Sequence, residues 1–266
     1  MKNILMTIEY DGTNFSGWQR QPDKRTVQGE LEKALSIVCG EDIKIDGTSR
    51  TDAGVHALGQ RATFSGNFKI PTERIMLAAN NILSGGKGRL SSDIRIVDIK
   101  EVPNGFHARF DSKGKTYIYK IVTCLSGNTF GRNHCCMIKD RLDVGKMQEA
   151  ANYIIGTKDF KSFQASGGTE KETTVRTIWE LEVLENERPL KDTEYGPQET
   201  VQEITIRVKG DGFLYNMVRI ITGTLVEVGL GKKNPIDLID IIESKDRSKA
   251  GYTAPPEGLY LKEIYY

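Results

Sequence analysis

The sequence predicts a mixed α/β fold of the α+β type, built from two ferredoxin-like β-α-β-β-α-β halves with mainly antiparallel sheets flanking a central cleft. Segments of strand and helix character follow that order twice along the chain. The 266 residues, 38% of them apolar, suffice for two modest cores. A break near 103–105 separates the two series, so the predicted domains are 1–104 and 105–266.

The first half is predicted from changes in hydrophobic period. Alternating apolar residues indicate strands, and apolar residues three and four apart indicate helices. The expected order is strand 4–10, helix 26–39, strand 43–48, strand 60–65, helix 72–83 and strand 94–102.

The second half repeats the pattern of elements, although not the letters. We expect strand 116–123, helix 144–155, strands 176–184 and 202–208, helix 216–228, an additional helix 236–244 and strand 259–264.

Helix 216–228 is apolar nearly all round and is therefore expected to be buried, with Arg219 in its middle. A buried guanidinium needs an acidic partner. Either Arg219 reaches the surface or pairs with a structural carboxylate such as Glu227, or it lies on a cleft wall and reaches Asp52.

Composition excludes several classes of protein. No apolar run approaches the roughly 18 residues of a membrane span, and no secretion signal is evident, so a soluble cytoplasmic protein is expected. The cysteines lack the spacing of a metal or redox site, even at His134-Cys135-Cys136, and are expected to be reduced structural thiols. Incomplete phosphate-loop and dinucleotide motifs argue against an NTPase or a nicotinamide enzyme.

Charge alone does not decide whether the chain binds RNA. The formal net charge is only +1, but charges are unevenly spread. The segment 185–203 is mostly acidic and is predicted to be a solvated hairpin tip facing away from nucleic acid. Basic residues gather at 24–25, 87–89, 113–120, 132–146 and 232–233.

The most informative stretch is Gly47-Thr-Ser-Arg-Thr-Asp-Ala-Gly-Val-His-Ala57, which places Asp52 in a polar loop between two expected strands. In an extended backbone Arg50 would lie on the same side and would hold the carboxylate ionised, while Gly54 permits a sharp turn. The structural alternative is a surface ion pair between Arg50 and Asp52.

This loop closely resembles the signature loop of the TruA-type tRNA pseudouridine synthases. Further segments match that family in its own order: 10–21, 106–110 with 115–119, 216–219 and 257–261. One departure is visible at 84–90, which resembles a short insertion and leaves local RNA contacts open.

The resemblance implies roles for individual residues. Asp52 would be the catalytic nucleophile, and Arg219 would hold it. Tyr117 would stack on the target uracil and assist proton removal, with Arg50 and Leu259 also at the substrate. Tyr119 is expected to be a packing residue, and His56 is given no catalytic role because a structural hydrogen bond suits it equally.

The function implied is isomerisation of uridine to pseudouridine at positions 38–40 of the tRNA anticodon stem-loop by a homodimer, without cofactor, metal or membrane. One alternative is a paralogue that modifies another RNA site. Another is a tRNA-binding folding chaperone without turnover. A hydrolytic glycosidase is less favoured, because it would ordinarily need a second positioned carboxylate.

Overall fold

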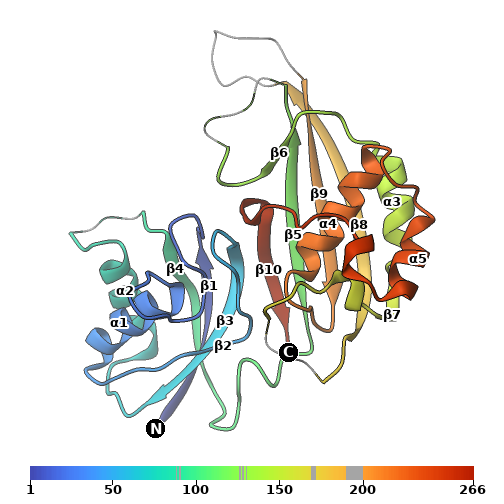
Figure 1. Cartoon of the computed structure of the whole chain (residues 1–266). Helices are drawn as coiled ribbons and strands as arrows, with labels where there is room; N and C mark the ends of the chain where they lie inside the picture. The colour runs from blue at the N-terminus through green and yellow to red at the C-terminus, as the bar shows by residue number, and fades with distance from the viewer. Residues whose placement is uncertain are drawn as a thin grey trace. The chain divides into compact units, whose positions relative to one another are not determined.

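A computed structural model describes residues 1–87, 89, 91–125, 127, 129, 131–168, 172–189 and 200–266. The chain divides into two compact units (Figure 1). Unit 1 comprises 1–113 together with 260–266, and unit 2 comprises 114–259. The predicted α+β class with mainly antiparallel strand pairing is confirmed.

Unit 1 has the predicted element order. Strand β1 pairs antiparallel with β3 and β4, the short β2 pairs antiparallel with β3, and β10 pairs parallel with β3. Helices α1 and α2 lie beside each other (Figure 1). The bounds are β1 Lys2–Tyr10, α1 Val27–Cys39, β2 Asp46–Gly47, β3 His56–Gly66, α2 Thr72–Leu83, β4 Ile94–Val102 and β10 Leu259–Tyr265.

Helix α1 begins and ends where its sequence signals predict. The hydroxyl of Thr26 accepts a hydrogen bond from the backbone N–H of Gly29, which satisfies one free donor of the first turn. Gly40 ends the helix with φ of +73°, a conformation that costs glycine little. The buried face of α1 carries Val27, Leu31, Ala34 and Leu35.

The expected strand 43–48 is mostly wrong, since only Asp46–Gly47 forms β2. The buried residues Ile43 and Ile45 donate their backbone N–H groups to side chains of α1, those of Ser36 and Glu32, instead of to a neighbouring strand. The alternating pattern at 43–48 therefore predicts the burial of these residues correctly, but it wrongly predicts that they pair with a neighbouring strand. Strand β3 also starts earlier than expected, at 56 instead of 60.

Unit 2 contains a sheet in the order β6-β5-β9-β8-β7, in which β6 is parallel to β5 and the other pairs are antiparallel. Its helices gather on one side of this sheet (Figure 1). The bounds are β5 Gly114–Thr123, β6 Cys136–Ile138, α3 Val144–Asn152, β7 Gly156–Asp159, β8 Val175–Pro189, β9 Thr200–Gly210, α4 Met217–Gly229 and α5 Asp237–Ser244, with 3-10 turns at Lys161–Phe163, Arg247–Lys249 and Pro256–Gly258.

Helix α4 is buried as predicted. Every residue of the helix except Arg219 and Glu227 is buried, including its threonines and glycines. A Cβ on Gly223 would lie 1.9 Å from the carbonyl oxygen of Tyr252, so the helix and the segment before β10 touch at backbone distance.

The acidic hairpin is described only in its flanks. Strands β8 and β9 pair as far as Pro189 with Thr200, and Arg141 forms an ion pair with Glu187 on β8. The predicted solvated tip falls largely on 190–199, outside the described residues, as do positions 88 and 90 of the expected insertion.

All four cysteines are free thiols, and three are buried. Burial raises the pKa of both Cys39 and Cys136 to about 11, so neither behaves as a reactive thiolate at neutral pH. Within the part of the chain that the structure describes, no helix combines the length and apolarity needed to cross a bilayer.

Candidate active site

The loop that carries Asp52 joins β2 to β3 in unit 1 and is fixed by its own backbone bonds. The N–H of Thr48 donates to the carbonyl of Arg61 at 2.9 Å. The fully buried amide of Gln60 donates to the carbonyl of Ser49 at 2.7 Å and accepts from its N–H at 3.3 Å. A network that satisfies both groups of one residue holds the loop's first half in a single conformation.

A second segment, 10–18, packs against the same loop. The N–H of Trp18 donates to the carbonyl of Thr51 at 3.0 Å, and the hydroxyls of Thr51 and Tyr10 are 2.7 Å apart. Two glycines allow the close approach. A Cβ on Gly12 would lie 2.0 Å from the carbonyl oxygen of Val55, and one on Gly17, whose φ is +91°, would lie 2.7 Å from that of Thr51.

Asp52 itself is half-buried, between these two fixed segments. Its carbonyl accepts the N–H of Val55 at 3.2 Å, and Gly54 has φ of +79°, which confirms the predicted sharp turn. Arg50, two residues earlier, is exposed. The relation between Arg50 and Asp52 stays a prediction.

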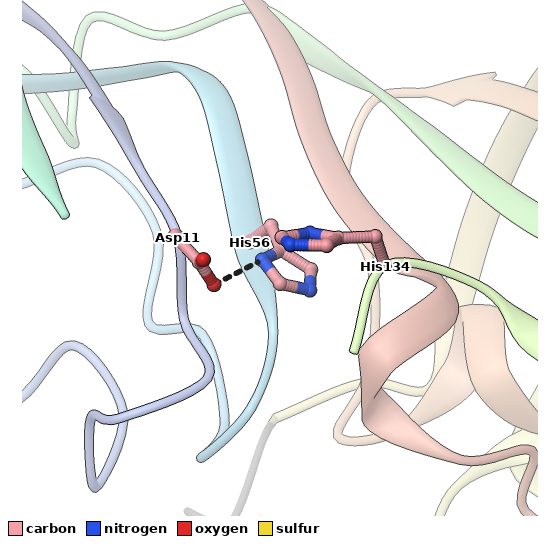
Figure 2. Close-up of side chains that lie close together, drawn as sticks. All are labelled: Asp11, His56 and His134. Carbon is pink, nitrogen blue, oxygen red and sulfur yellow. Dashed lines mark ion pairs between the residues drawn. The ribbon is translucent and has the colours of Figure 1, made fainter. Parts of the chain in front are cut away.

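His56 is a buried structural residue at the start of β3 (Figure 2). Its Nδ1 accepts a hydrogen bond from the N–H of Gly12 at 3.0 Å and lies 3.2 Å from Oδ1 of Asp11. Its ring stacks on that of Tyr260, with centroids 4.6 Å apart. His56 therefore ties the 10–18 segment to β3. His134, also drawn in Figure 2, belongs to unit 2.

In unit 2, strand β5 carries two buried tyrosines, and the prediction that Tyr119 is a packing residue is confirmed. Tyr119 is fully buried and donates its hydroxyl to the carbonyl of Pro255 at 2.7 Å, and burial raises its pKa strongly. It is therefore a packing residue. Tyr117 is 7% exposed, and its ring meets that of Phe213 edge-on, with centroids 5.2 Å apart and an interplanar angle of 86°. This contact fixes the plane of the Tyr117 ring.

Arg219 is half-buried on the first turn of α4. Its Nε donates to the carbonyl of Ala254 at 2.7 Å, and its NH1 donates to Oδ1 of Asn216 at 2.9 Å. Glu227, one candidate partner, instead pairs with Lys233 at 3.5 Å. The guanidinium is thus positioned by an amide and a carbonyl of its own unit.

The segment 254–259 links these parts of unit 2. Ala254 also donates its N–H to the carbonyl of Arg219 at 3.1 Å, while Gly258 lies against the ring of Tyr119. Leu259 follows directly and is 7% exposed. Three predicted site residues, Tyr117, Arg219 and Leu259, therefore lie on connected elements of unit 2. The other two, Asp52 and Arg50, lie on one loop of unit 1.

Sequence reasoning missed the residues that hold the loop in place. The sequence pattern predicts only that Gln60 belongs to a strand, and it assigns no separate role to Gly12, Gly17 or Trp18. The available signal was the presence of two glycines and a tryptophan in a short polar segment, which is typical of tight packing against another backbone.

Comparison with known proteins identifies the class. A family model described as tRNA pseudouridine synthase matches residues 6–111 and 150–266. The chain is 46% identical to tRNA pseudouridine synthase A 2 of Clostridium tetani over 267 residues, covering 100% of this chain and 99% of that protein. It is 45% identical to tRNA pseudouridine synthase A of Thermoanaerobacter sp. and 46% identical to that of Ruminiclostridium cellulolyticum, each over 266 residues and the full length of both chains.

The class is therefore that of the isomerases that modify RNA. The chain belongs to the tRNA pseudouridine synthase family and converts uridine to pseudouridine in tRNA.

Proposed function

We propose that this enzyme acts at positions 38–40 of the anticodon stem-loop and that Asp52 is its nucleophile. The observation that supports the nucleophile assignment most directly is the setting of Asp52. Its loop is held by the 10–18 segment and by Gln60, while its side chain is only half-buried. A fixed carboxylate that solvent still reaches can meet a substrate without a large rearrangement of the protein.

The reaction is suited to a carboxylate. The bond between N1 of uracil and C1′ of ribose breaks, the base turns, and C5 bonds to C1′ while the C5 proton leaves and N1 gains one. Substrate and product are isomers, so no oxidant or energy source is consumed. A nucleophile divides such an exchange into easier steps through a covalent adduct, and we propose that Asp52 forms it without a cofactor.

We further propose that the target nucleotide leaves its stack before reaction, with Tyr117 against the face of the uracil and Leu259 beside it. The edge-on contact with Phe213 leaves the ring of Tyr117 ordered, which lowers the entropy lost on stacking. Arg50, exposed on the Asp52 loop, would contact the RNA, and Arg219 would support the nucleophile.

We also propose that the chain forms two domains, 1–104 and 105–266, that it assembles as a homodimer, and that it is located in the cytoplasm.

The central test is Asp52→Asn in purified protein incubated with unmodified tRNA, without metal or cofactor. We expect pseudouridine formation, measured by nucleoside analysis, to disappear because an amide is a poor nucleophile, while tRNA affinity persists. Asp98→Asn, which changes an exposed carboxylate of the same unit, serves as the control. An unchanged pseudouridine yield with Asp52→Asn would refute the nucleophile assignment.

The substrate position needs a separate experiment. Pseudouridines are mapped in tRNA from a deletion strain and from reactions in vitro. Loss confined to positions 38–40 supports the proposal, whereas loss at another site makes the enzyme a paralogue of different specificity.

A further inference from the structure

Arg20 lies on an exposed loop, 19–25, that leaves the packed 10–18 segment. Its side chain is 55% exposed, and its NH1 donates to Oε2 of Glu32 on α1 at 2.9 Å. Among the residues that the structure describes, none forms a hydrogen bond with its Nε or NH2. One edge of the guanidinium is therefore held by the protein, and the other edge faces solvent.

Glu32 makes this arrangement rigid. Its side chain is only 7% exposed, and its Oε1 accepts the N–H of Ile45 at 3.1 Å and the side-chain amide of Gln28 at 3.1 Å. Gln28 in turn accepts the backbone N–H of Arg20 at 2.9 Å. Both the backbone and the guanidinium of Arg20 are thus anchored to α1, so little conformational entropy is left to lose when a ligand binds.

The position of Arg20 relates it to the Asp52 loop. It follows Trp18 by two residues, which places the two Cα atoms within about 7 Å. The N–H of Trp18 is bonded to Thr51, and the Trp18 ring lies where a Cβ on Gly47 would approach to 2.5 Å. Trp18 therefore packs against both ends of the segment that leads to Asp52.

The other arginine of this loop is used differently. Arg25 forms a two-point ion pair with Asp93, at 2.6 and 3.0 Å, and its guanidinium lies 4.2 Å from the ring centroid of Phe15. These contacts use the donors of the Arg25 guanidinium to hold the 19–25 loop in place. Arg20 keeps a two-donor edge exposed, which is the geometry that binds a phosphate at two oxygens.

We propose that Arg20 binds a backbone phosphate of the tRNA beside the target uridine, and that Glu32 is the residue that positions it. The inference rests on the proposed function in one respect, that the Asp52 loop is the active site. A phosphate contact fixed to that loop would set the register of the RNA strand and help to offset the cost of extruding the base.

The test compares Arg20→Ala, Glu32→Gln and the double variant with Lys33→Ala, which removes one exposed charge from the same helix. For each we measure kcat and KM with unmodified tRNA, the dependence of tRNA affinity on salt, and the melting temperature. Arg20→Ala should raise KM about tenfold with kcat unchanged at saturating tRNA, and should reduce the salt slope by about one. Lys33→Ala should change none of these.

Glu32→Gln keeps the oxygen that accepts from Ile45 and Gln28 but replaces the one that holds Arg20. It should raise KM by a smaller factor, and the double variant should match Arg20→Ala, because Glu32 acts through Arg20. The double variant also removes the unpaired buried carboxylate, so it reports on KM even if Arg20→Ala is unstable.

A KM for both Arg20→Ala and the double variant within twofold of that of Lys33→Ala, in folded protein, would overturn the proposal. Independent effects of the two substitutions would overturn the positioning role of Glu32. Both results are distinct from a failure of the proposed function, which would appear as an active Asp52→Asn enzyme.

Discussion

Gly12 illustrates how one residue outside the Asp52 loop controls it. The carbonyl oxygen of Val55 occupies the space that a Cβ at residue 12 would need, and the N–H of Gly12 donates to His56. Any side chain must push apart two backbones, one of which leads from the candidate nucleophile.

Gly12→Ala should therefore lower the free energy of unfolding by about 1–3 kcal/mol, the usual range for overpacking, and should reduce kcat as the Asp52 loop shifts. Urea unfolding and initial rates measure the two effects. Gly105→Ala is the matched control, because a Cβ there meets nothing within 4 Å and its stability should change little. Equal stability of the two variants would contradict the close approach.

The sequence predicts the local setting of single residues more readily than the contacts that hold them. Asp52 in a polar turn and Arg219 on a buried helix follow from local pattern. The partners of Arg219 found within unit 2, Ala254 and Asn216, do not all follow, because Ala254 is 35 residues away and contributes only a backbone carbonyl. Backbone acceptors carry no sequence signature.

Helices and strands were predictable where the hydrophobic period continued over several helical turns or over a long strand. Helix α2 and strand β4 have the predicted bounds, and α4 has the predicted burial. The short strands β6 and β7, of three and four residues, were not predicted. They form because β5 and β8 offer edges to pair with, which is a tertiary effect that no short window contains.

Strand β6 buries the thiol of Cys136 beside β5, and burial raises its pKa to about 11. The thiol of an unfolded chain titrates near pH 8.5. Because the folded pKa is the higher one, this contribution to stability is complete below about pH 8.5 and is lost as pH rises towards 11.

Urea unfolding of wild type and Cys136→Ala between pH 8 and 10 tests this. The wild type should lose stability more steeply, because the unfolded chain gives up a proton that the folded chain retains. The alanine variant should start less stable, owing to the cavity, and then decline less. Parallel curves would show that Cys136 is not the group responsible.

At the scale of the whole molecule, the C-terminus belongs to the first unit. Residues 260–266 group with 1–113, although they come last in the sequence. Tyr260 and Leu261 pair in parallel with His56 and Ala57 of β3. A parallel pairing between residues about 200 positions apart cannot be inferred from periodicity, which predicted a strand here but not its partner. These two compact units differ from the predicted domains, 1–104 and 105–266, in where the boundary lies and in the place of the last residues. That 1–104 and 105–266 are separate domains stays a prediction.

The last residues should therefore be needed for the stability of unit 1. The carbonyl of Tyr265 accepts the N–H of Lys113 at 2.8 Å, and the hydroxyl of Tyr266 donates to the carbonyl of Ala108 at 3.0 Å. Deleting 260–266 should expose one edge of β3 and speed amide hydrogen exchange throughout that strand.

Tyr266→Phe, which keeps the ring against Phe106, should cost only about 1 kcal/mol in the free energy of unfolding.

Lys262→Ala is the control for these two changes, since it alters an exposed side chain of the same strand and should leave exchange unchanged. Unaltered protection of β3 in the deletion variant would show that the terminal strand is dispensable. Accelerated exchange in unit 1 with helix α3 still protected would instead show that the two units unfold separately, because the loss would be confined to the unit that the terminal strand completes.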